Sequence, residues 1–247
     1  MPVNLEGEIS SALSSLQTNG YYVFRNRIQL DCLSKIQAVV AKGGLTPELP
    51  HQARASYEVN RHQAIGDCDR LRFFYSDKSI HSVSRILAPY MAAFRAIAQL
   101  YIGTTRLSSR QLGWLSVGRH LQNTTDLSDA AQLFHFDYDS FNFVKIFIYL
   151  SDVDAASGMH EYVSSSHKKF PMSQQALLNI PPYFRIQKEQ LERIYGSSSV
   201  FVQHTGVAGT IIIEDTSGFH RGSPLHPGSI RDIMVLEYLD SDLRKLT

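Results

Sequence analysis

The sequence has little of several features that mark particular classes of protein. Its only cysteines, Cys32 and Cys68, are too few for a disulfide framework and show no CxxC spacing. No apolar run approaches the roughly 20 residues that a membrane-spanning helix needs. The N-terminal residues also lack the basic and apolar regions of a signal peptide. We therefore expect a cytoplasmic protein without a membrane span.

A strong charge of either sign is missing as well. The chain carries 24 Lys and Arg against 23 Asp and Glu, which leaves a formal net charge of +1. Such a balance produces no field that would attract a polyanion, so we expect no nucleic-acid partner. The composition does not indicate an oligomeric state.

What the chain does have is enough apolar residues for one sizeable core. It is 247 residues long and 43% hydrophobic, close to the size at which a single core stops growing. We find no internal repeat and no linker that divides it. The sequence therefore predicts a single domain over 1–247.

The first 104 residues are expected to be mainly helical. The spacing of apolar residues predicts helices over 5–16, 30–40 and 79–102, the last of them broken by Pro89. The run Tyr21–Phe24 predicts a short strand. The polar stretch 44–69 is weakly periodic, and we interpret it as a loop over an active site. The helical segment 1–104 is expected to pack on the outside of a β-rich remainder of the chain.

The pattern changes after Gly103, where short runs rich in Ile, Val, Phe and Tyr alternate with turn residues. The predicted strands are Ser109–Val117, Leu133–Tyr138, Asn142–Leu150, His160–Val163, Val200–Gln203, Thr210–Glu214 and Ile230–Leu239. Several strands at such spacing predict a sandwich or barrel over 105–247.

Two metal-ligating side chains share one of these strands. In the segment Phe134–Tyr138, side chains of a strand would alternate, so His135 and Asp137 would point to one face and the phenylalanines to the other. An imidazole and a carboxylate so placed can reach the same metal ion. A surface strand without a metal would show the same pattern, so the pair needs a third ligand.

Five downstream histidines offer that third ligand: His160, His167, His204, His220 and His226. We choose His220, because the strand 209–214 and the turn 215–218 would place it at the start of a returning strand. Two histidines and one carboxylate form the facial triad that suits non-haem Fe(II) and leaves coordination positions open. A lone histidine would more often be a hydrogen-bonded structural residue.

Two cations are further candidates for the site, although a strand-end arginine without a metal nearby would more often be an ordinary one in water. Arg231 opens the apolar strand Ile230–Leu239, and its planar guanidinium matches a carboxylate with two hydrogen bonds, as a dicarboxylate cosubstrate would require. Lys145 is the only charge in Asn142–Leu150, a strand that is apolar on both faces, so something anionic is expected to neutralise it.

These residues occur in an order that resembles the phytanoyl-CoA dioxygenase family of Fe(II)- and 2-oxoglutarate-dependent oxygenases. The resemblance covers roughly 112–238 and is carried by His135-Phe136-Asp137, the strand 144–152, the segment 158–168, the run Glu214-Asp215-Thr216-Ser217-Gly218-Phe219-His220-Arg221-Gly222, and Arg231. The chain departs from the family at Ser164-Ser165-Ser166-His167, where Pro-Gly-Ser-His is more usual.

The resemblance implies a mainly β fold with flanking helices, a double-stranded β-helix or jelly roll of the cupin type. It implies that His135, Asp137 and His220 are the catalytic iron ligands and that Arg231 binds the remote carboxylate of 2-oxoglutarate. It allows Lys145 to contact that cosubstrate too, with an ion pair to Asp137, Asp139 or Asp152 as the alternative. Thr216 is a further candidate near the cosubstrate, unless it only forms the turn. By family position, His160 and His167 are loop or supporting residues.

The implied activity is that of a dioxygenase, an oxidoreductase that uses Fe(II), O2 and 2-oxoglutarate. We expect hydroxylation of an unactivated C–H of a small molecule, with release of succinate and CO2. Desaturation, cyclisation or epimerisation by the same iron-centred oxidant, or a catalytically idle jelly-roll binding protein, are the alternatives. The carboxylate of Asp137 favours oxygenation over halogenation. Substrate specificity is expected to lie in 44–69, 122–132 and 171–203.

Overall fold

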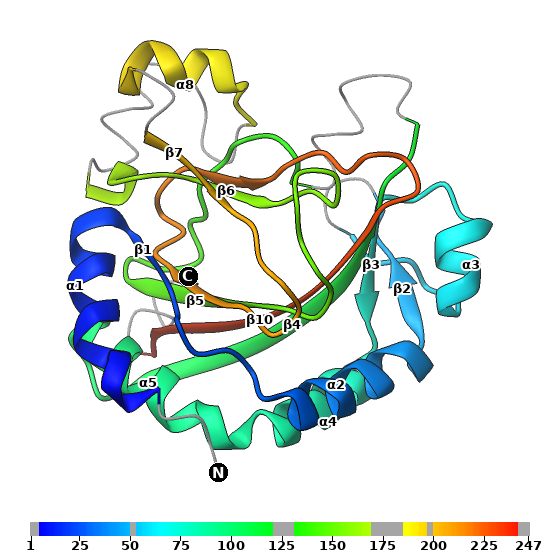
Figure 1. Ribbon diagram of the computed structural model, residues 1–247, viewed down its shortest axis with the longest axis horizontal. Helices are drawn as coiled ribbons and strands as arrows, with labels where there is room; N and C mark the ends of the chain where they lie inside the picture. Colours follow the sequence, from blue (N-terminus) through cyan, green and yellow to red (C-terminus); the bar gives the residue numbers. More distant parts are fainter. Residues whose placement is uncertain (1–4, 50–52, 121–130, 169–184, 197–199, 242–247) are drawn as a thin grey trace.

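The computed structural model describes residues 5–49, 53–120, 131–168, 185–196 and 200–241 (Figure 1). Its helices are α1 (Ile9–Asn19), α2 (Leu30–Lys42), α3 (Arg61–Gly66), α4 (Asp77–Ile86), α5 (Ala88–Ile102) and α8 (Lys188–Tyr195), with short 3-10 turns at Glu6–Glu8 and Ser166–Lys168. Its strands are β1 (Tyr21–Val23), β2 (Leu45–Pro47), β3 (Arg72–Tyr75), β4 (Leu107–Val117), β5 (Phe143–Tyr149), β6 (His160–Val163), β7 (Phe201–His204), β8 (Ile211–Glu214), β9 (His220–Gly222) and β10 (Ile230–Asp240).

The strands form two antiparallel sheets. The large sheet has the order β1-β8-β5-β10-β4-β3-β2, and the small sheet has the order β7-β6-β9. In Figure 1 the small sheet lies across from the large one, while α1, α2, α4 and α5 lie beyond the opposite face of the large sheet. Lys145 and Arg231 of the large sheet and His220 of the small sheet line the same cavity, so the candidate site lies between the two sheets.

Alternation along the strands divides the core in two. On β5, Ile146 and Ile148 belong to the core that the helices cover, together with Met234 and Leu236 of β10. The intervening residues of the same strands belong to a second cluster on the inner face, which includes Phe147, Tyr149, Ile233 and Val235. Since neighbouring side chains of a strand point to opposite faces, both faces of the large sheet are buried. This arrangement explains why β5 is apolar on both sides apart from Lys145.

The predicted break in the long apolar helix is confirmed. The chain forms α4 and α5 with Leu87 between them, and Pro89 stands in the first turn of α5, where proline is tolerated because no hydrogen-bonded amide is needed. Gly103 ends α5 in the left-handed region, with φ of 81°.

Most predicted strands are confirmed with ends shifted by one or two residues, but two predictions for local structure are wrong and one strand was missed. The segment 133–138 is not a strand, because only Phe134 and His135 form isolated bridges. The stretch 44–69 is not simply a loop, since it contains β2 and α3. The strand β3 was not predicted at all. Thus the helical segment 1–104 also supplies β1, β2 and β3 to the large sheet.

Within the described ranges we find no helix with the length and apolar character needed to cross a membrane.

Candidate metal centre

Backbone hydrogen bonds bring the predicted metal ligands together. His135 and His220 form an isolated antiparallel bridge, in which each amide donates to the other's carbonyl at 2.9 and 2.8 Å. The amide of Asp137 donates to the carbonyl of Thr216 at 2.8 Å. The segment that contains the His-x-Asp pair is therefore held against the turn before β9, although it is not a regular strand.

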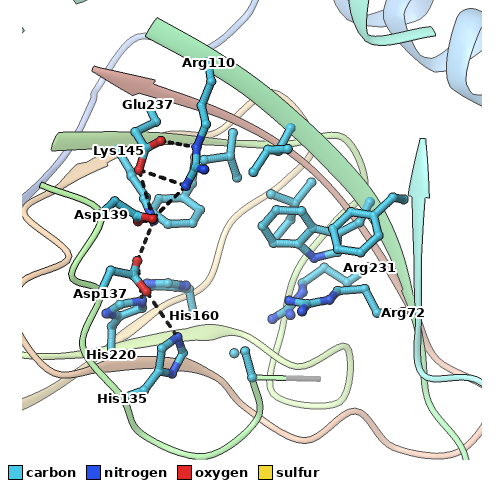
Figure 2. Close-up of a pocket in the computed structure, with 18 of the residues that line it drawn as sticks. Arg72, Arg110, His135, Asp137, Asp139, Lys145, His160, His220, Arg231 and Glu237 are labelled. Atoms are coloured by element: carbon cyan, nitrogen blue, oxygen red, sulfur yellow. Dashed lines mark hydrogen bonds and ion pairs between the residues drawn. The ribbon is translucent and has the colours of Figure 1, made fainter. Parts of the chain in front are cut away.

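The side chains converge as a metal site requires. One ligand atom from each of His135, Asp137 and His220 lies within 4.8 Å of the other two, and no other group of this kind occurs in the described ranges. The Nε2 atoms of His135 and His220 lie 3.8 and 3.5 Å from the carboxylate oxygens of Asp137 (Figure 2). The Nδ1 atoms face the carbonyls of Leu133 and Gly218, each at 3.0 Å. Such contacts favour a proton on Nδ1 and leave Nε2 as the ligand atom.

Burial sets the charge of these groups. Burial and the neighbouring His220 hold the pKa of His135 well below its ordinary value, and burial also lowers the pKa of His220. Burial alone would raise the pKa of Asp137, but Lys145 and the two imidazoles outweigh it and leave that pKa below its ordinary range. Two neutral imidazoles and one ionised carboxylate are the donor set that fits Fe(II).

Arg231 lies in the same cavity and has unused donors. It lies opposite Ser116 of β4, is 4% exposed, and its Nε and Nη1 have no hydrogen-bond partner among the described residues. Burial and the nearby guanidinium of Arg72 lower the pKa of Arg231 to about 10. Gly222 leaves room for it, because a Cβ there would collide with the guanidinium. An unpaired buried cation of this kind fits an incoming carboxylate.

Lys145 contacts carboxylates of the chain itself. Its Nζ lies 2.6 Å from Asp137 Oδ2, 2.6 Å from Asp139 Oδ2 and 3.4 Å from Glu237 Oε1. Of the two interpretations left open by the sequence, the structure therefore contains the ion pair, with Glu237 as a partner in place of Asp152.

Thr216 is fully buried, and its Oγ1 has no hydrogen-bond partner among the described residues. It is not among the residues that line the cavity. What the structure shows for Thr216 is the contact of its carbonyl with the amide of Asp137.

The cavity that joins these groups has a volume of about 210 Å³. One side holds Arg72 and Arg231. Across the cavity are Arg110, Lys145, Asp139 and Glu237, and the three candidate metal ligands lie next to this second group (Figure 2). Trp114, Phe147 and Ile233 supply apolar walls. Of the three segments expected to set specificity, the described residues of 44–69 contribute nothing to this lining. Most of 122–132 and much of 171–203 lie outside the described residues.

Sequence reasoning missed a buried polar group behind the centre. His160 Nε2 lies 2.7 Å from Glu214 Oε2, and His204 Nε2 lies 3.5 Å from Glu214 Oε1. The ring of His160 also stacks on that of His220, with centroids 5.6 Å apart. Burial raises the pKa of Glu214 to about 7 and lowers that of His204 to about 4. The signal was a glutamate that ends the apolar run Thr210–Glu214.

No family model matches the chain, and no curated protein matches it either. Solved structures do match. EvdO2 from Micromonospora carbonacea var. aurantiaca, complexed with 2-oxoglutarate, is 14% identical with a TM-score of 0.61, over 94% of this chain and 90% of that one. The α-ketoglutarate-dependent carbocyclase SnoK from nogalamycin biosynthesis is 14% identical with a TM-score of 0.64, over 98% and 88%. EctD from S. alaskensis with bound Fe is 14% identical with a TM-score of 0.60, over 95% and 77%.

These likenesses confirm the predicted fold. The chain is a mainly β protein with flanking helices, and its fold is a double-stranded β-helix like that of these solved structures. At such low identity the likeness concerns the fold, so the role of each site residue depends on the geometry described above.

Proposed function

We propose that this protein is a Fe(II)- and 2-oxoglutarate-dependent dioxygenase that hydroxylates an unactivated C–H bond of a small molecule. One observation carries the proposal. A single cavity pairs two imidazoles and a carboxylate with a buried arginine, Arg231, whose Nε and Nη1 have no partner among the described residues. The two imidazoles and the carboxylate fit Fe(II), and the guanidinium of Arg231 fits a carboxylate of the cosubstrate.

The residues divide the work of this reaction. His135, Asp137 and His220 hold the iron, and Arg231 binds and orients the remote carboxylate of 2-oxoglutarate. The bound iron supplies the oxidation, in which one oxygen atom of O2 enters the substrate and the other enters 2-oxoglutarate, which loses CO2 and becomes succinate. Trp114, Phe147 and Ile233 exclude water around the two groups.

The fold neighbours support the assignment of these two small molecules. EvdO2 is described as complexed with 2-oxoglutarate, and EctD as carrying bound Fe. Within this fold we also propose the phytanoyl-CoA dioxygenase family, on the ordered motifs around Asp137, His220 and Arg231. No strongly basic cluster suggests a handle for coenzyme A, so we do not take the substrate from the family name.

A second candidate function uses the same site for a different outcome. SnoK is described as a carbocyclase, and SnoN from the same biosynthesis as an epimerase, and both match the chain over at least 95% of its length. Ring closure or epimerisation therefore stays the alternative to hydroxylation.

The test has a binding step and a turnover step. Anaerobic addition of Fe(II) and 2-oxoglutarate is expected to produce a weak visible charge-transfer band, and its absence would favour an idle binding protein. Oxygen is then admitted with a panel of small metabolites, and succinate release identifies the substrate. Product mass separates the outcomes: a gain of one oxygen for hydroxylation, a loss of two hydrogens for ring closure or desaturation, and no change for epimerisation.

A further inference from the structure

A row of alternating charges crosses the inner face of the large sheet. Glu237 of β10 lies directly opposite Arg110 of β4 on one side and Lys145 of β5 on the other, and Lys145 lies opposite Glu214 of β8. Side chains directly opposite each other on antiparallel strands share a face. The four residues therefore point toward the candidate metal centre.

The ammonium group of Lys145 contacts carboxylates of this row and of the neighbouring segment 137–139. Glu214 is engaged by His160, and the ammonium instead faces the carboxylates of Asp137, Asp139 and Glu237. A lysine ammonium has three hydrogens, and three carboxylates lie within 3.4 Å of Nζ. Two of these contacts are hydrogen bonds, to Asp137 and Asp139, and the third is an ion pair with Glu237, so the charge of the ammonium is already balanced by the chain itself.

One of the three carboxylates is the candidate iron ligand. Lys145 donates to Asp137 Oδ2 at 2.6 Å (Figure 2). The same Oδ2 lies 3.5 Å from His220 Nε2, and Oδ1 lies 3.8 Å from His135 Nε2, so both oxygens face imidazoles but Lys145 engages only Oδ2. The lysine side chain is only 12% exposed, and Glu237, at 1% exposed, pairs with both Lys145 and Arg110. The ammonium is therefore held in place from the side away from the metal centre.

We infer that Lys145 is a positioning residue that restricts Asp137 to one donor oxygen toward the metal. A carboxylate can ligate with one or both oxygens. Three single-atom protein ligands would leave a six-coordinate ion enough free positions for 2-oxoglutarate and O2. A second oxygen from Asp137 would take one of these positions. This inference depends on the proposed function.

The test uses Co(II) alone as the probe, added to the metal-free protein. Lys145→Met is expected to change the intensity and position of the Co(II) visible bands, because a second carboxylate oxygen joins the metal. Co(II) is expected to bind at least as tightly, since a positive charge beside the ligand is gone. Titration of the Co(II) protein with 2-oxoglutarate is expected to show binding at least tenfold weaker.

Arg110→Met is the matched control. It removes a positive charge from the same row but keeps the contact between Lys145 and Asp137, so the Co(II) bands are expected to match those of the wild type. Should Lys145→Met fail to fold, the double variant Lys145→Met/Asp139→Asn restores the charge balance and is read by the same bands.

Three results would overturn the inference, and they differ from one another. Unchanged bands with unchanged 2-oxoglutarate binding would make Lys145 a structural residue only. Unchanged bands with weakened 2-oxoglutarate binding would mean that Lys145 contacts the cosubstrate directly. A wild-type protein that binds no Co(II) would instead refute the metal centre, and with it the proposed function.

Discussion

The two ends of the cavity each hold a buried cation, and the chain treats them differently. Lys145 has three carboxylates within 3.4 Å, whereas two nitrogen atoms of Arg231 have no partner among the described residues. Burying a charge is costly unless it is paired. At the Lys145 end the chain supplies the opposite charge itself, and at the Arg231 end we expect a ligand to bring it.

The surroundings of the two cations lead to opposite shifts in their pKa values. Burial alone would lower the pKa of Lys145, but its three carboxylates raise that pKa above its ordinary value. Burial and the neighbouring Arg72 lower the pKa of Arg231 to about 10. A paired cation is part of the folded scaffold, and an unpaired one marks a place for an anion.

The largest effect is expected at the metal centre itself. His135→Ala removes one of three ligands, and we expect loss of stoichiometric Fe(II) retention and of succinate release. The circular dichroism spectrum should stay that of the wild type, because the backbone bridge to His220 does not need the imidazole. Full iron content after dialysis would exclude His135 as a ligand of the metal centre.

The next largest effect is expected at the unpaired cation. Arg231→Met should weaken 2-oxoglutarate binding about a hundredfold, since a two-point contact to a charged group is worth about 3 kcal/mol. Without 2-oxoglutarate its melting temperature should not fall, because an unpaired buried charge is removed. The exposed Arg85→Met is the matched control. An unchanged 2-oxoglutarate requirement would contradict the role of Arg231 in binding the cosubstrate. A strongly lowered melting temperature would show that Arg231, like Lys145, stabilises the folded protein.

A smaller effect, visible only as a dependence on pH, is expected at Glu214. Burial raises its pKa from 4.5 to about 7, so its contribution to stability is fully present below pH 4.5 and is lost as pH rises through 7. Glu214→Gln stays neutral, and the metal-free variant should exceed the wild type in unfolding free energy at about pH 8, by at most about 3 kcal/mol, but not at low pH. Urea unfolding at both pH values measures it, and an equal difference at both would contradict the raised pKa.

The smallest effect is expected at Thr216. Its hydroxyl is buried and its residue does not line the cavity, so Thr216→Val should change 2-oxoglutarate binding by less than about threefold, within the energy of a weak neutral hydrogen bond. Isothermal titration of the metal-loaded protein measures this. A tenfold loss would instead give the hydroxyl the cosubstrate contact that the sequence suggested.

Local patterns in the sequence predicted what depends on neighbours along the chain. The alternation in β5 identified the face that carries Lys145 and Phe147, and the turn at 215–218 predicted that His220 begins a strand. The strand β3 was missed because its four-residue run opens with a charged residue, Arg72, whose burial depends on an ion pair with the distant Glu48 in the folded sheet. The segment around His135 resembles a strand in its pattern, but it pairs only through isolated bridges.

Contacts between distant segments were beyond local patterns. One of the carboxylates that pair with Lys145 belongs to Glu237 of β10. Its position opposite Lys145 depends on the register between β10 and β5, which only the folded sheet defines. The contact of Glu214 with His160 and His204 likewise joins the two sheets. Arg72, which lies beside Arg231, belongs to the strand that the sequence pattern did not predict.

The reciprocal amide-to-carbonyl pair between His135 and His220 has a consequence for how quickly the protein can be loaded. These main-chain bonds fix the backbone at both histidines, and the Nδ1 contacts with the carbonyls of Leu133 and Gly218 orient the two rings. Uptake of an ion therefore requires little rearrangement of the polypeptide. The rate of metal binding should then be limited by dehydration of the entering ion and its diffusion into the cavity. The metal-free protein should also resist proteolysis around these two residues as well as the metal-bound protein does.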